Sequence, residues 1–536
     1  MEVRIMRRFL ISMFFVAMVC CFVQTSEAKK KVPVVVPDDY PTIEEAYTNV
    51  KDGGIISIKP GKYKLKKTLG IDRTVTFRSS SGNQEDVSIN CEDDTTVRVM
   101  SGSPVFKNLT FNCGKEDGNA FIIAKGSSPK LFQCDLASQK GTGLFISEKS
   151  SPTLEKCVIK DCGDSGVIFC EESAGELHEC EIFGCGSVGL VVLESANPTV
   201  IGCKIHDGKT IGVLVTQEGR GEFQGCDIYA NGKDGVLVGE LGNPKFTECK
   251  IHDGNIGGVG VMKKGSGEFK NCEIFGNKES GFRVKEAGCP TVTECKIYGQ
   301  EFVGVFVAEE SRAKFTDCEI YKNALLGIVV MDSGDPTFSG CKIYEQEGAG
   351  VGVMKEGLGK FSDCDIYKNG KDGFVIAESG NPTVTGCKIH DQTERGMVVH
   401  SKGRGEIRDC EFYKNDIAGF RVQESGNPIV TGCKIHHNDK IGLYIAKEGY
   451  GEFRDCDIYG NMVGIGVAEF GNPTVTGCKI HDGYGPGVGV LEDGMGTFND
   501  NTLSRNYLQG KLVNWGITPK AGEVKGSGNT PEIQKP

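Results

Sequence analysis

Apolar residues recur at fixed distances from a cysteine that itself returns every 23 residues. In each period they stand three before the cysteine and two, ten and twelve after it, as in Phe223, Cys226, Ile228, Val236 and Val238. A fixed period of about 20–50 residues is typical of one structural unit stacked many times. Fifteen cysteines keep this register, and Cys478 follows one residue early. The fifteen are Cys134, Cys157, Cys180, Cys203, Cys226, Cys249, Cys272, Cys295, Cys318, Cys341, Cys364, Cys387, Cys410, Cys433 and Cys456.

The spacing inside each period predicts short strands. Strand side chains alternate between two faces, and the Gly, Asn-Pro and Asn-Gly positions between the apolar pairs accept turn geometry. A glycine stands nine residues after the cysteine in nearly every period, as in Gly235 and Gly258. Strands of successive copies must run in the same direction, so we expect them to stack about 4.8 Å apart. The usual right-handed crossover predicts the hand of the coil.

The repeated unit Cys-x-Ile-x-x-[Asn/Gly]-x-x-x-Gly-[Val/Ile/Phe]-x-Val extends from about Leu109 to Val513. It resembles the β-helix repeats of the pectin-lyase-like superfamily. The resemblance implies an all-β fold, a single-stranded right-handed parallel β-helix of about 23 residues per coil, with a short N-terminal capping helix. That superfamily includes lyases, hydrolases, epimerases and non-catalytic repeat proteins, so the resemblance implies a fold rather than a reaction.

The first 28 residues have the layout of a secretory signal peptide. Residues 1–8 are basic, residues 9–23 are apolar, and Ser26-Glu27-Ala28 fits a small-x-small cleavage site. We therefore expect a secreted or periplasmic protein with no stable membrane insertion after cleavage.

Three further segments follow the predicted signal peptide. Residues 29–108 are expected to form an N-terminal cap and first irregular coils, in which Thr42 begins a short helix that covers the open end. Residues 109–513 are the regular repeats. Residues 514–536 are expected to form a C-terminal cap and a flexible tail, which starts at Pro519.

The acidic charge limits the partners. The formal net charge of the whole chain is −11 at pH 7, whereas nucleic acid and anionic lipid require a basic surface. We expect no nucleic acid partner and favour a neutral polysaccharide or a surface protein.

Two outward columns follow the cysteine. The residue after it alternates between Lys and an acid, as in Lys204, Asp227 and Lys250, which favours the correct register of neighbouring coils. The third residue after it is aromatic or His. This column either stacks on itself, which stabilises the rod, or presents rings to the sugars of an extended glycan. The candidate binding residues are Tyr298, Tyr321, Tyr344, Tyr367, His390 and Tyr413.

Four His-Asp pairs lie in this column: His206-Asp207, His252-Asp253, His390-Asp391 and His481-Asp482. Histidines of alternate coils are expected about 9.6 Å apart, too far to share one ion. Adjacent side chains of a continuing strand also point to opposite faces, so we interpret the pairs as a surface ladder with a turn-forming Asp. His436-His437 breaks the pattern. No metal ligand and no cofactor is predicted.

No catalytic residue is predicted either. A cleft on a β-helix needs long inserted loops and clustered acids with a cation, Arg or Lys. The period stays at 23 from Cys134 to Cys456, so no such loop is inserted there. The motifs that the resemblance would supply for epimerases and polygalacturonases are missing.

The inward cysteines are expected to pack as free thiols, because a disulfide needs Cβ atoms closer than the strand spacing allows. Cys162 and Cys185, each five residues after a ladder cysteine, are a candidate disulfide at a turn. The hypothesis for the whole chain is an exported, non-catalytic rod that binds an extended glycan or a protein. The alternative is a polysaccharide lyase, epimerase or hydrolase.

Overall fold

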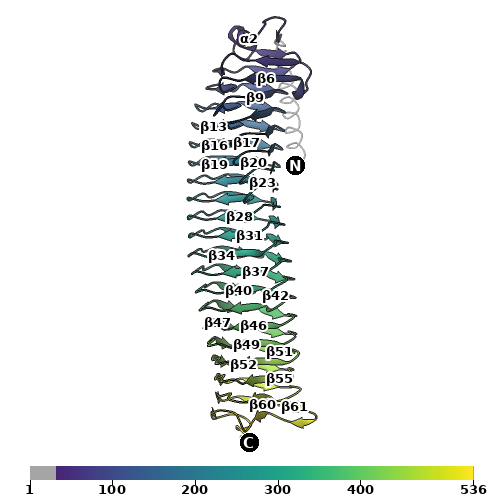
Figure 1. The fold of residues 1–536 in the computed structure, drawn as a ribbon, viewed down its shortest axis with the longest axis vertical. Helices are drawn as coiled ribbons and strands as arrows, with labels where there is room; N and C mark the ends of the chain where they lie inside the picture. Colours follow the sequence, from purple (N-terminus) through teal and green to yellow (C-terminus); the bar gives the residue numbers. More distant parts are fainter. Residues whose placement is uncertain (1–31, 535–536) are drawn as a thin grey trace, which may run out of the picture.

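A computed structural model describes residues 32–534 as one long rod (Figure 1). The predicted signal peptide, residues 1–28, lies outside the described residues. Coils of about 23 residues stack for about 21 turns from the N-terminal to the C-terminal end. No helix of the described part is long and apolar enough to cross a membrane.

Three parallel sheets, of 22, 20 and 20 strands, form the sides of the rod. Sheet A contains the strand before each cysteine, sheet B the strand after it, and sheet C the strand that follows the conserved glycine. Each strand pairs in parallel with the strand one coil further on. One coil is β26 (Lys245–Thr247), β27 (Lys250–His252) and β28 (Gly257–Val261), and the next is β29 (Glu268–Lys270), β30 (Glu273–Phe275) and β31 (Ser280–Val284). The right-handed parallel β-helix predicted from the period is confirmed.

A single apolar core runs along the axis of the rod. In the coil of β26 to β28, the side chains of Phe246, Cys249, Ile251, Val259 and Val261 all point inward and are at most 1% exposed. Phenylalanines of sheet A stack in runs, as Phe223 stacks on Phe246 and Phe246 on Phe269. Burial of one such residue set in every coil supplies the apolar area that stabilises the stack.

The cysteines are thiols that pack in this core, as predicted. All 22 described cysteines are free, and all of them except Cys289 are buried. Their sulfurs also donate to backbone carbonyls: Cys295 Sγ lies 3.5 Å from Phe269 O and 3.4 Å from Thr293 O. Burial raises the pKa of Cys157 well above its usual value, so this thiol stays protonated.

The candidate disulfide partners, Cys162 and Cys185, are both buried free thiols in this structure. They lie at the corner between sheets B and C, where Cys162 Sγ donates to Lys160 O at 3.5 Å and Cys185 Sγ donates to Phe183 O at 3.6 Å. Their oxidation to a disulfide stays a prediction.

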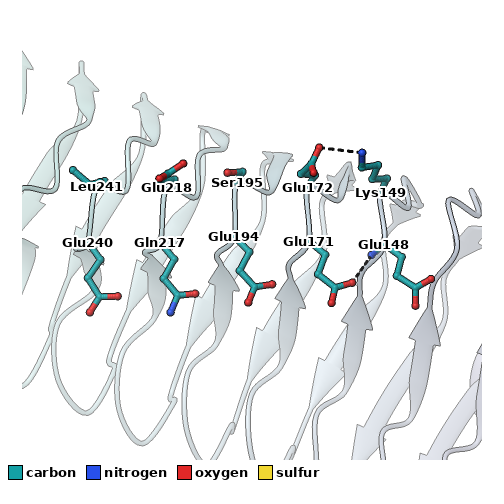
Figure 2. A pocket seen from close by; sticks show the side chains of 10 residues that line it. All are labelled: Glu148, Lys149, Glu171, Glu172, Glu194, Ser195, Gln217, Glu218, Glu240 and Leu241. Atoms are coloured by element: carbon teal, nitrogen blue, oxygen red, sulfur yellow. Dashed lines mark hydrogen bonds and ion pairs between the residues drawn. The ribbon is translucent and has the colours of Figure 1, made fainter.

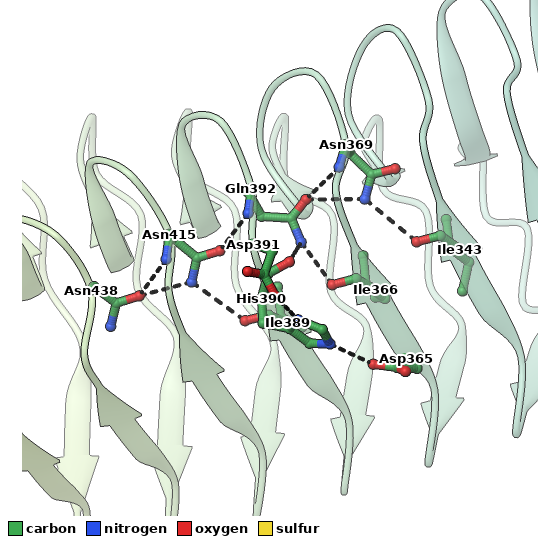
Figure 3. A network of polar contacts seen from close by, with 10 residues as sticks. All are labelled: Ile343, Asp365, Ile366, Asn369, Ile389, His390, Asp391, Gln392, Asn415 and Asn438. Carbon is green, nitrogen blue, oxygen red and sulfur yellow. Dashed lines mark hydrogen bonds and ion pairs between the residues drawn. The ribbon is translucent and has the colours of Figure 1, made fainter.

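A ladder of buried amides occupies the same corner in the following coils (Figure 3). Asn369 Nδ2 and the Asn369 backbone N–H both donate to Gln392 Oε1 at 3.0 Å, and Asn369 Oδ1 accepts the Gln346 N–H at 3.2 Å. Each side chain thus satisfies turn backbone groups that would otherwise be buried without partners. The members are at most 2% exposed. They are Asn277, Gln300, Asn323, Gln346, Asn369, Gln392, Asn415, Asn438 and Asn461.

The two ends of the rod are covered. Thr42 caps the helix α2 (Ile43–Asn49) by accepting the Glu45 N–H at 3.1 Å, which confirms the predicted capping helix. A 3-10 turn, η1 (Gln84–Asp86), is the other helical segment described. The N-terminal coils already join the three sheets, since β1 (Val34–Val36) pairs with β2 (Ile55–Ile58) in sheet A.

Two short strands extend the sheets into the predicted C-terminal cap and tail, and the flexibility of the tail stays a prediction. Strand β63 (Trp515–Ile517) pairs with β58 (Val488–Val490), and β64 (Val524–Lys525) pairs with β59 (Gly496–Asn499). The chain winds on because the last coil would otherwise leave apolar side chains and strand backbone groups uncovered.

We predict that Asn369→Ala destabilises its corner by about 1–3 kcal/mol, because the Gln346 N–H loses its acceptor in a buried place. Amide hydrogen exchange at Gln346 measures this locally, since a repeat array can open in parts. The control is Asn381→Ala, at an exposed position. Equal exchange at Gln346 in both variants would contradict the role given to the ladder.

Candidate functional site

The structure brings the six candidate binding residues together on the outer surface of sheet B. They end the strands β33 (Lys296–Tyr298), β36 (Glu319–Tyr321), β39 (Lys342–Tyr344), β42 (Asp365–Tyr367), β45 (Lys388–His390) and β48 (Glu411–Tyr413). In each strand the central residue points inward and both ends point outward, so the rings form one column.

The rings of this column stack face to face. The ring centroids of Tyr321 and Tyr344 lie 5.0 Å apart, those of Tyr344 and Tyr367 lie 4.9 Å apart, and the planes differ by 6° and 4°. Both faces of each inner ring are therefore covered by its neighbours, and only ring edges and hydroxyl groups face solvent. The geometry supports the stacking interpretation, whereas stacking of sugars on ring faces has no free surface here. Glycan binding by these residues stays a prediction.

In each His-Asp pair the imidazole lies between two carboxylates, one from the following Asp and one from the preceding coil, and we call this arrangement a clamp. His390 Nε2 lies 2.9 Å from Asp365 Oδ1 of the preceding coil, and His390 Nδ1 lies 2.5 Å from Asp391 Oδ2. The expectation that adjacent His and Asp side chains point apart is wrong, because Asp391 has a positive φ of 54° and turns back toward the ring. Carboxylates only accept, so a ring that carries protons on both nitrogens satisfies both contacts.

The His390 clamp favours the charged ring. Burial by itself lowers the pKa of His390, but the hydrogen bonds to Asp365 and Asp391 outweigh it and the pKa is raised. The same arrangement surrounds His206, His252 and His481.

An acidic groove lies along the edge between sheets C and A (Figure 2). Two successive residues of each turn have positive φ, as at Glu148 and Lys149, and the side chains of the first residues point in one direction. The groove has a volume of about 880 Å³. It is lined by Glu148, Lys149, Glu171, Glu172, Glu194, Ser195, Gln217, Glu218, Glu240 and Leu241. Lys149 Nζ lies 3.3 Å from Glu172 Oε2, so the ammonium group of this lining pairs with a carboxylate of the next coil. Nowhere in residues 32–534 do three or more His, Cys, Asp or Glu side chains gather so that they could hold a metal ion.

The outer face of sheet C differs from the other faces because it is apolar. The residue between the two inward positions of each strand is apolar in six successive coils, joined in register. These residues are Ile122, Phe145, Ile168, Val191, Leu214 and Leu237. The repeat pattern does not specify this position, although its apolar residues are visible in the sequence.

A charged cluster interrupts the apolar face further along. Arg283 Nη2 donates to both carboxylate oxygens of Asp234 at 3.0 and 3.1 Å, and Arg283 Nη1 lies 3.5 Å from Glu279 Oε2. The Asp234 side chain is only 6% exposed. Burial raises the pKa of Asp234, and the nearby Arg283 opposes the shift. Phe302 and Phe306 line a hollow of about 210 Å³ beside Arg283. Sequence reasoning missed this cluster, because Asp234 and Arg283 lie 49 residues apart.

A related cluster follows six coils later. The segment Asn369-Gly370-Lys371-Asp372-Gly373 repeats Asn231-Gly232-Lys233-Asp234-Gly235. Here Arg395 pairs with Asp372 at 2.6 Å. Arg421, which corresponds to Arg283, contacts the Tyr444 ring at 5.2 Å and has no acidic partner within the described part of the chain. Its Nε is buried without a hydrogen bond, and burial lowers the pKa of Arg421.

Comparison with family models gives one match, to the family described as "Right handed beta helix region". Four overlapping matches cover residues 73–205, 188–301, 280–422 and 375–523, which is most of the chain. The chain belongs to the right-handed β-helix family. The comparison of this β-helix protein with curated proteins found no match.

Solved structures similar to this β-helix protein include polysaccharide-active proteins. The periplasmic alginate epimerase AlgG is 11% identical, with a TM-score of 0.42, over 62% of this chain and 82% of its own. A pectin methylesterase from Aspergillus niger is 14% identical, with a TM-score of 0.32, over 48% and 87%. Pectate lyase Pel9A is 13% identical, with a TM-score of 0.25, over 62% and 74%. Similarity at this level indicates the fold alone.

We predict that Tyr344→Ala lowers the free energy of unfolding by about 1–3 kcal/mol, because it removes two ring stacks. Urea unfolding followed by circular dichroism measures the loss. The control is Tyr450→Ala, at a tyrosine that is 41% exposed. A stable Tyr344→Ala variant that loses glycan binding would instead favour the binding platform.

We predict that His390 stabilises the rod at low pH and loses this effect at high pH. Its pKa is raised in the folded state, so the stabilisation is complete below the unfolded value of about 6.5 and disappears as the pH rises through the folded value. His390→Phe keeps a ring in the column, as Phe275 does in its own coil. Urea midpoints of wild type and His390→Phe should converge as the pH rises from about 5.5 to 9. A difference that is independent of pH would contradict the clamp.

Proposed function

We propose that this protein is an exported rod that binds an extended polysaccharide along the outer face of sheet C. The single observation that carries the proposal is the apolar column from Ile122 to Leu237, which continues through six successive coils. In this column Phe145, Ile168, Leu214 and Leu237 are partly exposed, whereas Ile122 and Val191 are buried, at 8% and 7% exposure. Apolar surface that extends over several coils marks a place of interaction. Sheet B presents charged side chains and ring edges instead.

The shape of the face suits a linear ligand. Successive side chains such as Leu214 and Leu237 stand one strand spacing apart, about 4.8 Å, with no inserted loop between them. A chain molecule can lie along such a strip and contact each coil in turn, whereas a small molecule would find no enclosing wall. Sugars carry apolar C–H faces that pack on aliphatic and aromatic side chains. Partly exposed rings, Phe145 and Phe306, lie on the same face.

The alternative function is a polysaccharide lyase, epimerase or hydrolase. One observation favours it: the cluster of Asp234, Glu279 and Arg283 combines two carboxylates with a guanidinium beside the hollow at Phe302 and Phe306. A carboxyl group with a raised pKa in a hollow is a candidate acid or base. Against this, Arg283 Nη2 donates to both oxygens of Asp234, and the Asp234 side chain is only 6% exposed, so little of this carboxyl group is open to a substrate. Binding without turnover is therefore the function that the geometry supports best.

We predict that the double change Leu214→Lys and Leu237→Lys weakens glycan binding at least tenfold, because it places two charges in the apolar strip. An oligosaccharide array with neutral and uronic-acid chains identifies a bound glycan, and titration calorimetry then measures its affinity. The matched control is Gln224→Lys with Thr247→Lys, which adds the same charges to sheet A, on the strands that directly follow those of Leu214 and Leu237.

The outcomes separate the hypotheses. Binding that both double variants retain equally would place the site elsewhere than on sheet C. No binding to any glycan would exclude the polysaccharide proposal and favour a protein partner. Reducing ends or unsaturated products released from the same panel would show that the protein is an enzyme.

A further inference from the structure

The coil of His436 differs from the other histidine clamps at one position. Elsewhere an Asp follows the histidine, but here the residue is His437, held in the same turn with a positive φ of 49°. His436 Nδ1 and His437 Nδ1 lie 2.9 Å apart. Two imidazole nitrogens thus face each other where the sister coils place a nitrogen against a carboxylate.

A carboxylate in the preceding coil sets the proton on His436. Glu411 Oε1 lies 3.0 Å from His436 Nε2, and a carboxylate only accepts, so the ring proton is at Nε2 and the Nδ1 lone pair faces His437. A histidine that donates to a carboxylate from one nitrogen and offers the other is the usual arrangement of a metal ligand in proteins.

Neighbouring residues hold both imidazole rings in place, and the His437 side chain stays exposed to solvent. His436 stacks on Tyr459 at 4.6 Å, and the His437 ring stands edge-on to Tyr459 at 5.5 Å. The His437 ring lies over Gly460, where a Cβ would come within 3.0 Å of its Nε2. A side chain at position 460 would push the ring away. His437 itself is exposed, so solvent ions reach the pair.

We propose that His436 Nδ1 and His437 Nδ1 form a two-nitrogen site for a divalent transition metal, with Cu²⁺ as the preferred ion. The site is independent of the polysaccharide proposal, since it lies on sheet B and its adjoining turn. When the ion binds, it takes the place of the N–H···N contact, and His437 carries its proton at Nε2. Water completes the coordination, because only these two ligands meet here.

The distance between the two nitrogens selects the metal. Two ligands about 2.0 Å from an ion and 2.9 Å apart subtend about 90° at the ion, the angle of neighbouring positions in a square or tetragonal complex. A tetrahedral Zn²⁺ needs ligand nitrogens about 3.3 Å apart. Nitrogen ligands in this arrangement favour Cu²⁺, which also binds most strongly among the first-row divalent ions.

The repeat supplies matched variants for the test. His437→Asp converts the site into the clamp of the sister coils, in which the imidazole Nδ1 carries a proton and donates it to the Asp carboxylate. Asp253→His creates a second pair beside His252. The residue at the equivalent position of the next coil is Gly276, just as Gly460 is for His437, so there is room for the new ring. Asp253 is exposed and already has a positive φ of 54°, so the turn accepts the change as it accepts His437.

The experiment is a titration of the untagged, metal-free protein with CuCl₂, followed by calorimetry and electron paramagnetic resonance. We expect one Cu²⁺ with coupling to two nitrogens, at least tenfold weaker binding in His437→Asp, and a second equivalent in Asp253→His. ZnCl₂ should bind at least tenfold more weakly than CuCl₂. Unchanged affinity in His437→Asp, a spectrum without coupling to two nitrogens, or no second equivalent in Asp253→His would each overturn the proposal.

Discussion

Backbone hydrogen bonds between strands about 23 residues apart hold every other feature of this rod in place. Each of the three sheets continues this parallel pairing from coil to coil, as in β25 (Val236–Val238) with β28 and β28 with β31. The pairing brings equivalent residues of successive coils about 4.8 Å apart. Equivalent residues of successive coils therefore form columns, in the core as well as on the surface.

The columns inside the rod stabilise it in different ways. Phenylalanine, isoleucine and valine columns remove apolar area from water, while the cysteine column fills the space beside them and donates weakly to carbonyls. The buried amide ladder satisfies the turn between sheets B and C. Without that ladder the tight corner would leave buried backbone donors unpaired, at a cost of about 1–3 kcal/mol for each group.

On the surface, the chemistry of a histidine depends on its turn. His390 and His436 occupy equivalent positions and stack on the same kind of column. The first lies between two carboxylates and its pKa is raised, whereas the second faces His437 and its pKa is lowered, chiefly by burial. A one-residue difference in the turn therefore changes a charged clamp into a pair of nitrogen ligands. Two equivalent arginines also differ through a neighbouring residue. Arg283 pairs with Asp234, whereas the equivalent of Asp234 near Arg421 is Asp372, which pairs with Arg395 instead.

The sequence by itself determined the architecture, because a strict period, alternating apolar residues and turn residues leave one way to stack the units. It also predicted the free thiols, the capping helix at Thr42 and the single column of rings. It left open whether the rings stack on one another or present their faces to a glycan, since side-chain torsions follow from packing between coils. Contacts such as Asp234 with Arg283 join residues two coils apart, and the turn that brings His437 Nδ1 to His436 Nδ1 depends on a left-handed backbone. Only the tertiary structure decided these contacts, because they depend on three-dimensional distances that the period does not encode.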